Sequence, residues 1–376
     1  MTNEQSWAVR TVESTIAQYP LLHEHPHLSD CWNYESGVML KAIKDVYEWT
    51  GDERYLSYIK RNIDHYVNEQ GEIRTYQLSD YNLDQINQGK ILLYLYRKTQ
   101  EDRYRKAFGR LFTQLQGQPR TDQGGFWHKK IYPYQMWLDG LYMAQPFLAE
   151  YAWMNEQPEL FDDVAHQLLL AEKRTRNCAT GLLHHAWDES REQEWADPEH
   201  GRSPHPWGRA VGWYCMAVVD VLDYLPLHHA KRGQIIGIFE RLIDALVRVQ
   251  DAESDVWHQV LDQKGRPGNY LEASCTAMIV YAGLKASRLG YLSGHYLAPM
   301  ERAFEGMLQQ FAEIDEQGHV HVHRINGVAG LGGHPYRDGS YTYYVSEQVV
   351  SDDPKGVAPF IMACLEHEKL AGGSHA

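Results

Sequence analysis

The chain has 376 residues, of which 43% are hydrophobic, so it is long enough to bury a substantial core. Asp and Glu number 50 against 36 for Lys and Arg, which gives a formal net charge of −14. This charge argues against nucleic acid or an anionic membrane surface as the main partner. No run approaches the ~20 apolar residues of a membrane span, and the first thirty residues lack the basic and apolar parts of a signal peptide.

The cysteines indicate a reducing compartment. There are five, an odd number, and they are widely separated and mostly inside apolar runs. They are Cys31, Cys178, Cys215, Cys275 and Cys364. A secreted disulfide framework usually shows an even number at short spacings. We therefore expect a cytoplasmic protein with reduced thiols.

The spacing of apolar residues predicts a mainly helical fold. Intervals of three and four recur in many segments and are plain at 92–96, 235–249 and 297–311. Alternation with period two is scarce, so we expect short strands only near 319–325 and 341–345. No Pro/Ser-rich linker interrupts the chain, which favours a single domain.

Six segments share a pattern in which polar or small residues are followed by a strongly apolar helix. They begin near Tyr34, Asp84, Asp139, Arg209, Glu272 and Lys355. Amphipathic segments with charged faces lie between them, at 55–66, 103–115, 160–174 and 232–250. This alternation predicts an all-α (α/α)6 toroid over residues 1–376, with an inner ring inside an outer ring. The polar starts of the inner helices would then meet at one rim. The spacing is irregular, so a generic helical array is the alternative.

Asp139 is the first candidate for chemistry at that rim. It lies in the stretch MWLDGLYMAQPF, among apolar and aromatic residues at the start of a predicted inner helix. Burial would raise the pKa of its carboxyl and make it a proton donor near neutral pH. The alternative is that Asp139 caps the helix that follows, and the same alternative holds for Asp84.

Several blocks of sequence occur in order between Trp32 and Phe360. They are WNYESG, NLDQINQGK, GGFWHKKIYPYQMWLDGLYMAQPF, GLLHHAWDES, PWGRAVGWY and GGHPYRDGSYTYYVSEQVVSDDPKGVAPF. Together they resemble the unsaturated rhamnogalacturonyl hydrolases, glycoside hydrolase family 105. The related unsaturated glucuronyl hydrolases of family 88 share the fold and chemistry but match these blocks less closely.

The resemblance implies hydration of a double bond, with no cofactor. The substrate would be an oligosaccharide left by a lyase, with a 4,5-unsaturated uronic acid at its non-reducing end. Unsaturated galacturonyl-rhamnose from rhamnogalacturonan is the expected case. A protonated carboxyl delivers a proton to C4, water adds at C5, and the hemiketal collapses. The products are the neighbouring sugar and a 5-keto-4-deoxyuronate.

The resemblance also assigns roles to residues. Asp139 matches the catalytic acid, and Asp84 matches a second carboxylate that stays ionised and stabilises positive charge at C5. Arg209, at the head of an inner helix, would offer a bidentate fork to the uronate carboxylate. His128 and His185 match positions in the substrate pocket.

Aromatic residues and one loop complete the predicted site. Trp32, Tyr34, Trp137, Trp207 and Trp213 would supply flat faces for sugar rings. The loop GGHPYRDGSY, which carries His334, would bear on the choice of leaving sugar.

Three other interpretations stay open. His319, His321 and His323 alternate along one predicted strand and, with His334, would suggest a metal enzyme, but they match no recognised ligand spacing, so we predict no metal. A conventional glycosidase with two carboxylates would act on saturated sugars at the anomeric carbon. A non-catalytic module would bind the sugar without turnover. The sequence indicates no oligomeric state.

Overall fold

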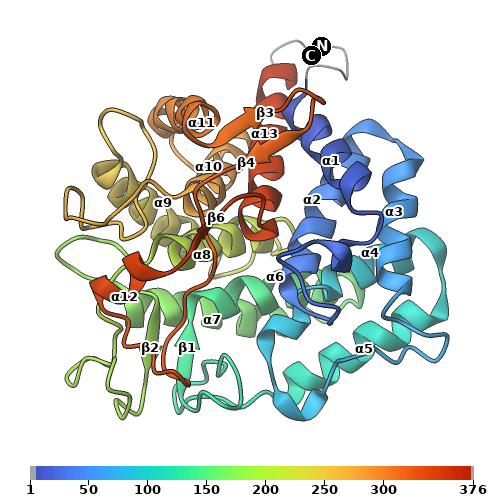
Figure 1. Ribbon diagram of the computed structural model, residues 1–376. Coiled ribbons are helices and arrows are strands. Elements are labelled where there is room, and N and C mark those ends of the chain that lie inside the picture. Colours follow the sequence, from blue (N-terminus) through green and yellow to red (C-terminus); the bar gives the residue numbers. More distant parts are fainter. Residues whose placement is uncertain (1–5, 374–376) are drawn as a thin grey trace.

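The structure, a computed structural model that describes residues 6–373, is built mainly from helices (Figure 1). Within that range six inner helices alternate along the chain with six outer ones. The inner helices are α2 (Tyr34–Thr50), α4 (Gly89–Thr99), α6 (Leu138–Met154), α8 (Gly208–Leu222), α10 (Ala273–Arg288) and α13 (Pro354–Gly373). The outer helices are α1 (Trp7–Gln18), α3 (Glu53–Asp64), α5 (Asp102–Gly117), α7 (Leu160–Thr175), α9 (Arg232–Val249) and α11 (Leu297–Phe311). The inner helices pack in chain order and α13 packs back against α2. This closed ring confirms the predicted (α/α)6 toroid.

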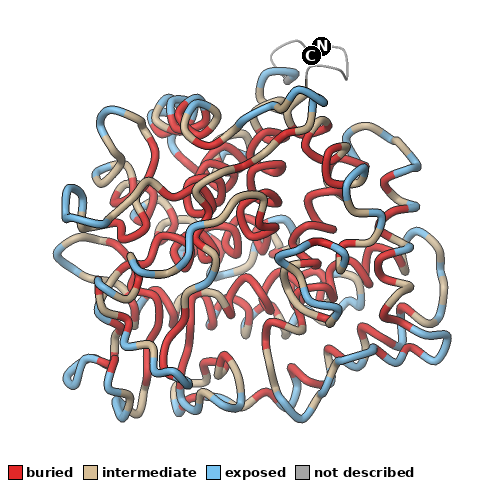
Figure 2. Tube along the Cα trace, in the orientation of Figure 1, coloured by how far each residue is buried: buried red, intermediate tan, exposed pale blue. Residues whose placement is uncertain are grey.

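The two rings differ in burial, as their sequences predict (Figure 2). Every residue of α8 is buried. In α3 the buried residues are Tyr55, Tyr58, Ile59, Asn62 and Ile63, which recur at intervals of three and four. Full burial of an apolar side chain stabilises by roughly 1.5–3 kcal/mol. The apolar inner ring therefore supplies much of the core, whereas an outer helix needs only one apolar face.

Most helix bounds agree with the sequence pattern, but one inner helix starts late. The four predicted outer segments match α3, α5, α7 and α9 to within two residues at each end. The inner helix expected near Asp84 begins at Gly89. Asp84 lies instead in the 3-10 turn η4 (Leu83–Ile86), whose first N–H groups are capped by Asn82. Further 3-10 turns are η2 (Leu22–Glu24), η3 (Leu78–Asp80) and η5 (Gly294–Tyr296).

The strands form three antiparallel pairs. They are β1 (Gln135–Trp137) with β2 (Ala186–Asp188), β3 (Ala312–Ile314) with β4 (Val320–Val322), and β5 (Ile325–Asn326) with β6 (Val349–Val350). The prediction of strand near 319–325 is confirmed by β4 and β5. The prediction of strand at 341–345 is wrong, because these residues form α12 (Tyr341–Ser346). Ser340 caps this helix by accepting a hydrogen bond from the Tyr343 N–H at 3.1 Å.

One large hydrophobic cluster runs through both rings. A smaller cluster lies beside β1 and β2 and is formed by Trp137, Ala186, Trp195, Ala196 and Leu331. All five cysteines are unpaired. Among the described residues, no helix has both the length and the apolar character needed to cross a bilayer.

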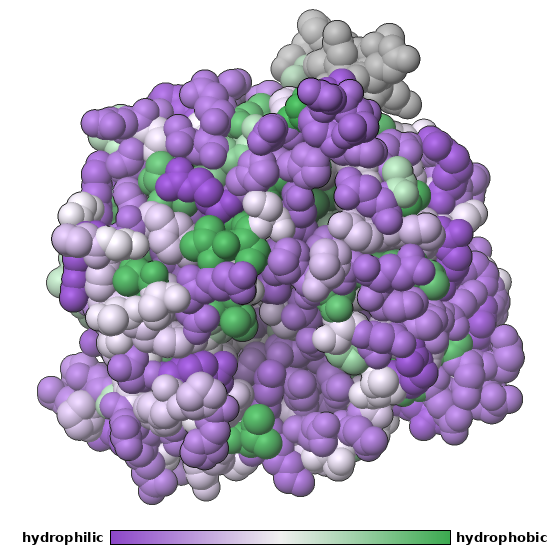
Figure 3. Space-filling view, viewed as in Figure 1, coloured by the Kyte–Doolittle hydropathy of each residue, from purple (hydrophilic) through white to green (hydrophobic). Residues whose placement is uncertain are grey.

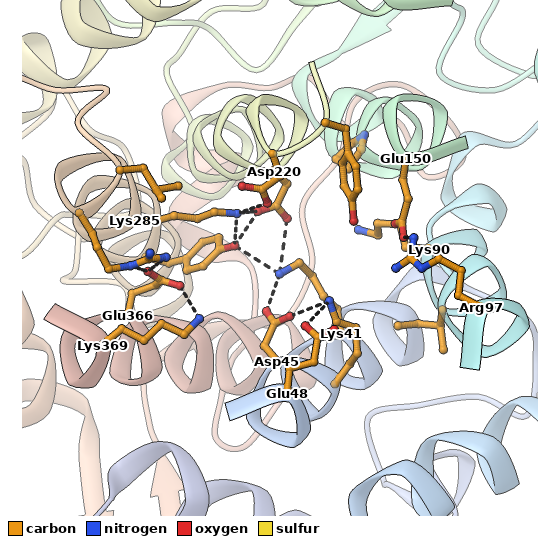
Figure 4. A pocket seen from close by; sticks show the side chains of 18 residues that line it. Lys41, Asp45, Glu48, Lys90, Arg97, Glu150, Asp220, Lys285, Glu366 and Lys369 are labelled. Atoms are coloured by element: carbon orange, nitrogen blue, oxygen red, sulfur yellow. Dashed lines mark hydrogen bonds and ion pairs between the residues drawn. The ribbon is translucent and has the colours of Figure 1, made fainter. Parts of the chain in front are cut away.

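The inner ring also encloses a cavity of about 290 Å³ that reaches the C-terminal parts of its helices. Its charged lining, named here the far-end network, consists of Lys41, Lys44, Asp45, Glu48, Lys90, Arg97, Glu150, Asp220, Asp223, Lys285, Arg288, Glu366 and Lys369. Figure 4 shows these side chains converging from all sides. Lys41 pairs with Asp45 at 2.6 Å, and Lys285 pairs with Asp220 at 2.8 Å. The network is therefore held by alternating opposite charges.

Candidate active site

Strand pairing brings Asp139 and His185 together. In the β1–β2 register Trp137 pairs with Ala186, and the next N–H, that of Leu138, donates to the His185 carbonyl at 3.0 Å. Asp139 follows in the first turn of α6, and its Oδ2 lies 3.2 Å from His185 Nε2. The cap residue of α6 is Trp137, so the alternative of Asp139 as the helix cap is wrong.

His185 is held from behind by aromatic residues. Its side chain is fully buried, and its Nδ1 lies 2.8 Å from the Tyr344 hydroxyl. Its ring packs against Trp207 at 4.7 Å, and Trp207 donates from Nε1 to Gln259 at 3.2 Å. These contacts fix the ring orientation, so Nε2 points at the carboxylate.

Asp84 is the second carboxylate of the site. Its Oδ2 lies 2.6 Å from Lys129 Nζ, and its Oδ1 lies 3.6 Å from His128 Nε2. Burial works against the charge of Lys129, but Asp84 outweighs it and the pKa of Lys129 is raised. The side chain of Asp84 therefore serves an ion pair and caps no helix.

His128 lies between the two carboxylates. Burial is the main reason why its pKa falls to about 4, so the ring is neutral at neutral pH, although Asp84 and Asp139 both favour its charged form. A Cβ at position 140 would lie 3.0 Å from His128 Nδ1 and 3.0 Å from the Leu83 side chain. Gly140 is thus needed for η4 and His128 to approach the start of α6 this closely.

The expectation of a raised pKa at Asp139 is wrong for the free protein. Burial does raise it and is the largest single influence. The charge and hydrogen bond of His185, the charge of His128 and a backbone N–H act together in the other direction, and the pKa of Asp139 is lowered. Apolar neighbours were visible in the sequence, whereas His185 comes from another strand.

A third carboxyl at the same rim behaves differently. Glu35, in the first turn of α2, accepts a hydrogen bond from Asn33 Nδ2 at 2.6 Å. Burial raises the pKa of Glu35; Asp84 also raises it, and Lys355 opposes the shift. The rim therefore holds carboxyls with separated pKa values, as acid and base catalysis requires.

Arg209 does not present the fork predicted for a uronate. Its residue is 1% exposed, and its guanidinium donates to the Asn326 carbonyl at 2.6 Å and to Asn326 Oδ1 at 3.0 Å. Further donors reach Ser274 and Gly327. The terminal nitrogens hold β5 against α8 and α10, and the role of Arg209 in uronate binding stays a prediction.

Most of the predicted sugar platforms are also covered. His128 and Tyr132 lie side by side over one face of Trp137, with centroids at 4.7 Å and 4.9 Å from it and nearly parallel rings. Trp213 stacks on Tyr142 at 5.0 Å. Trp32, Trp207 and Trp213 are each 1% exposed. These tryptophans therefore support the site from within, and of the predicted set only Tyr34 is partly exposed.

His334 is exposed and lines a groove of about 820 Å³ with Tyr132, Gln135, Tyr336 and Arg337. Gln135 is the first residue of β1 and Tyr132 stacks on Trp137 at its end, so the groove reaches the strand that leads into α6. Elements α12 and β6 cross the face seen in Figure 1, and the same face is hollowed near its centre among mostly hydrophilic residues (Figure 3).

The histidines of the metal interpretation do not converge. His321 lies between Asp352 at 2.8 Å and Asp315 at 3.3 Å, whereas His323 pairs with Glu313 at 3.0 Å. His334 lies in the groove described above. Of the three, only His321 lies within β4, where it points outward; His319 shares Asp315 with it at 3.3 Å, and His323 contacts a different carboxylate.

The sequence interpretation missed three residues of the site, which are Lys129, Glu35 and Tyr344. Lys129 adjoins His128 within a recognised block, so it could have been found. Glu35 adjoins Tyr34 in the same way. Tyr344 lies 159 residues from His185, and no local pattern indicated that they meet.

Comparison with known proteins places this site in a family. The family model described as Glycosyl Hydrolase Family 88 matches residues 7–371. A solved glycoside hydrolase of family 105 from C. acetobutylicum ATCC 824 is 45% identical, with a TM-score of 0.94 over 97% of this chain and 100% of that one. The unsaturated rhamnogalacturonyl hydrolase YesR of Bacillus subtilis (strain 168) is 29% identical over 77% of this chain and 78% of its own length. The unsaturated glucuronyl hydrolase of Bacillus sp. GL1 is 14% identical, with a TM-score of 0.70 over 96% of this chain and 95% of that one, and shares the fold.

The chain belongs to glycosyl hydrolase family 88 and is a glycosidase. The predicted relationship to families 105 and 88 is confirmed.

Proposed function

We propose that this glycosidase hydrates the C4–C5 double bond of a 4,5-unsaturated uronic acid at the non-reducing end of an oligosaccharide. The observation that carries the proposal is the pairing of Asp139 with His185 and of Asp84 with Lys129 at one rim, with neutral His128 between them. The name of the B. subtilis relative supports the same reaction.

Asp139 is the proton donor to C4 in this proposal, and substrate binding favours the protonated form of its carboxyl. The uronate brings a negative charge close to a carboxylate whose pKa is lowered in the free protein. A nearby like charge and the exclusion of water both favour the protonated form of a carboxyl. The acid form of Asp139 is therefore reached in the complex, where its proton is used.

Asp84 stays ionised beside Lys129 and faces the positive charge that develops at C5 and the ring oxygen. Water adds at C5, and the hemiketal collapses to the 5-keto-4-deoxyuronate and the released sugar. Lys129 takes the role first predicted for Arg209, because it is the partly exposed cation at this rim, with 23% of its side chain accessible. Tyr34, His128 and His185 line the bound uronate.

The sugar next to the uronate is the finer part of the proposal. We propose rhamnose, as the resemblance implies, and the name of YesR supports this choice. His334, in the groove beside Tyr132, would contact that leaving sugar.

The test is a panel of disaccharides generated by lyases, with ultraviolet absorbance and product release followed together. We expect the absorbance of the conjugated uronate to disappear as the sugar is released. Release of sugar with the absorbance retained would establish the conventional glycosidase instead. Binding without turnover would establish the non-catalytic module.

The variant Lys129→Met tests whether Lys129 binds the carboxylate of the uronate. We expect this variant to raise KM for unsaturated uronates, with a smaller effect on kcat. An unchanged KM would remove Lys129 from uronate binding and leave the reaction itself untouched.

A further inference from the structure

A cluster of two histidines and one carboxylate lies outside the catalytic rim, on the segments before α2 and after α3. It consists of His23 in η2, Asp30 in the loop that follows, and His65 at the end of α3. One potential ligand atom from each of the three lies within 4.8 Å of the others. The rings of His23 and His65 stack at 4.2 Å with an interplanar angle of 10°.

One nitrogen in this cluster has two incompatible neighbours. His65 Nε2 lies 2.8 Å from Asp30 Oδ1 and 2.5 Å from a terminal nitrogen of Arg74. A proton on Nε2 would serve the carboxylate but face an N–H of Arg74. A lone pair on Nε2 would accept from Arg74 but oppose the carboxylate. No single protonation state of the ring satisfies both contacts.

A divalent cation satisfies both, because carboxylate and imidazole lone pairs can point at the same metal. Two ligand atoms of a tetrahedral Zn²⁺ site with bonds of about 2.0–2.2 Å lie about 3.3–3.5 Å apart. His65 Nε2 and Asp30 Oδ1 are 2.8 Å apart, and all three ligand atoms lie within 4.8 Å of one another. Side-chain rotation, including a turn of the His23 ring out of its stack on His65, brings them to the spacing of a tetrahedral site, and three protein ligands leave one position for water. Neutral imidazole and carboxylate are ligands that Zn²⁺ and its neighbours in the first transition row accept.

Arg74 now serves Asp30 and His65 as their cation. Its guanidinium contacts both Asp30 and His65, and its hydrogen bond is the main reason why the pKa of Asp30 is lowered. Its side chain is 44% exposed and also lies over the Tyr66 ring at 5.0 Å. An exposed arginine can swing into solvent, so the same acceptors become available to a metal.

We propose that His23, Asp30 and His65 bind one divalent transition metal ion, Zn²⁺ in the first place, in exchange for the guanidinium of Arg74. The site joins η2, the loop at Asp30 and the end of α3. Trp32, two residues after Asp30, donates from its backbone N–H to Thr75 at 2.7 Å, and α2 begins at Tyr34. The bound ion therefore fastens the segment that leads to the catalytic rim.

The experiment is calorimetric titration of the full chain with ZnCl₂, after removal of metal by a chelator and of the chelator by exchange. We expect one equivalent to bind the wild-type protein. His65→Gln and Asp30→Asn should each weaken binding by at least about tenfold, because each removes a ligand. Arg74→Gln should tighten it by up to about tenfold, because a positive charge a few ångströms from the metal is removed.

His295→Gln is the matched control, since His295 is an exposed histidine far along the chain that contacts Ser293 and Tyr296. It should bind Zn²⁺ as the wild type does. Zn²⁺ should also raise the thermal midpoint of the wild-type protein more than that of His65→Gln. Equal affinity in the wild type, His65→Gln and Asp30→Asn, or no binding even to Arg74→Gln, would overturn the proposal.

Discussion

The two ends of the inner ring use the same kinds of side chain for opposite purposes. At the far end, Asp220 is bonded to Lys285 at 2.8 Å and to the Tyr281 hydroxyl at 2.5 Å, and Lys41 lies 3.6 Å away. At the catalytic end, Asp139 has one close partner, His185, at 3.2 Å. A carboxylate paired with several groups on other helices holds the helices together, whereas a carboxylate with one titratable partner can exchange a proton.

Helix direction contributes to this difference. The N-terminal ends of the inner helices meet at the catalytic rim, and their free N–H groups favour anions such as Asp139 and the bound uronate. The C-terminal ends meet at the other side, where free carbonyls favour cations, and Arg97, Lys285 and Arg288 lie in the last turns of α4 and α10. Lys90 reaches the same cavity from the first turn of α4; burial lowers its pKa to about 7, and its Nζ has no hydrogen-bond partner.

The largest expected effect comes from a variant that disrupts the catalytic end of the ring. Asp139→Asn should lower kcat by about 10²–10⁴-fold, because the amide keeps the shape and loses the proton. Substrate affinity should persist, as measured by titration with an unsaturated disaccharide. Glu35→Gln is the control, since it removes a rim carboxyl with a raised pKa. If Glu35→Gln abolished turnover and Asp139→Asn did not, the proton donor would be Glu35.

The second prediction concerns a variant that disrupts the far-end network. Asp220→Asn should destabilise the protein by about 3–5 kcal/mol, because Lys41 and Lys285 would lose a buried counter-charge. The shift is read from the urea midpoint, and activity per folded molecule should be retained. Glu48→Gln removes a half-exposed partner of Lys44 and should cost less than about 1 kcal/mol. Equal effects of the two changes would contradict a role for burial.

Arg209 distinguishes a structural role from a binding role. Arg209→Met should destabilise by about 1–3 kcal/mol, because the Asn326 carbonyl and side chain would lose buried donors. Discrimination between substrates with a free and an esterified uronate should not change beyond the loss of stability. A selective loss for the free uronate would restore the role predicted from the sequence.

A shift in pH dependence is the smallest expected effect. Removal of the charge and hydrogen bond of His185 raises the pKa of Asp139. Because the acid form of Asp139 is reached in the complex and is lost as pH rises through its pKa there, the alkaline limb of kcat in His185→Leu should move to higher pH. The measurement is kcat from about pH 4 to 9, around the ordinary carboxyl and imidazole values. Movement of the limb to lower pH would contradict the role of His185.

The sequence predicted the (α/α)6 barrel, but it did not predict the contacts and protonation of the side chains at the rim. Helix periodicity and polar helix starts identified the barrel and put Asp84 and Asp139 at one rim, because these patterns are local. The environment of each group depends on long-range contacts. The pairing of Asp139 with His185 follows from the β1–β2 register, and the use of Arg209 follows from its contact with Asn326.

The same limit explains the aromatic residues. Trp137, Trp207 and Trp213 belong to the recognised blocks. Composition alone could not distinguish an aromatic ring that contacts a sugar from one that packs inside the protein. Their neighbours Tyr132 and Tyr142 cover faces that would otherwise meet a sugar.

Closure of the inner ring has a consequence for biosynthesis. Helix α13 is the last of the six inner helices along the chain, and it packs against both α10 and α2. Until it emerges from the ribosome, the nascent chain is an open arc with two apolar helix faces uncovered, a state that invites association with other chains. A message truncated before α13 would therefore give an aggregating product, although Asp84, Asp139 and His185 would all be present in it.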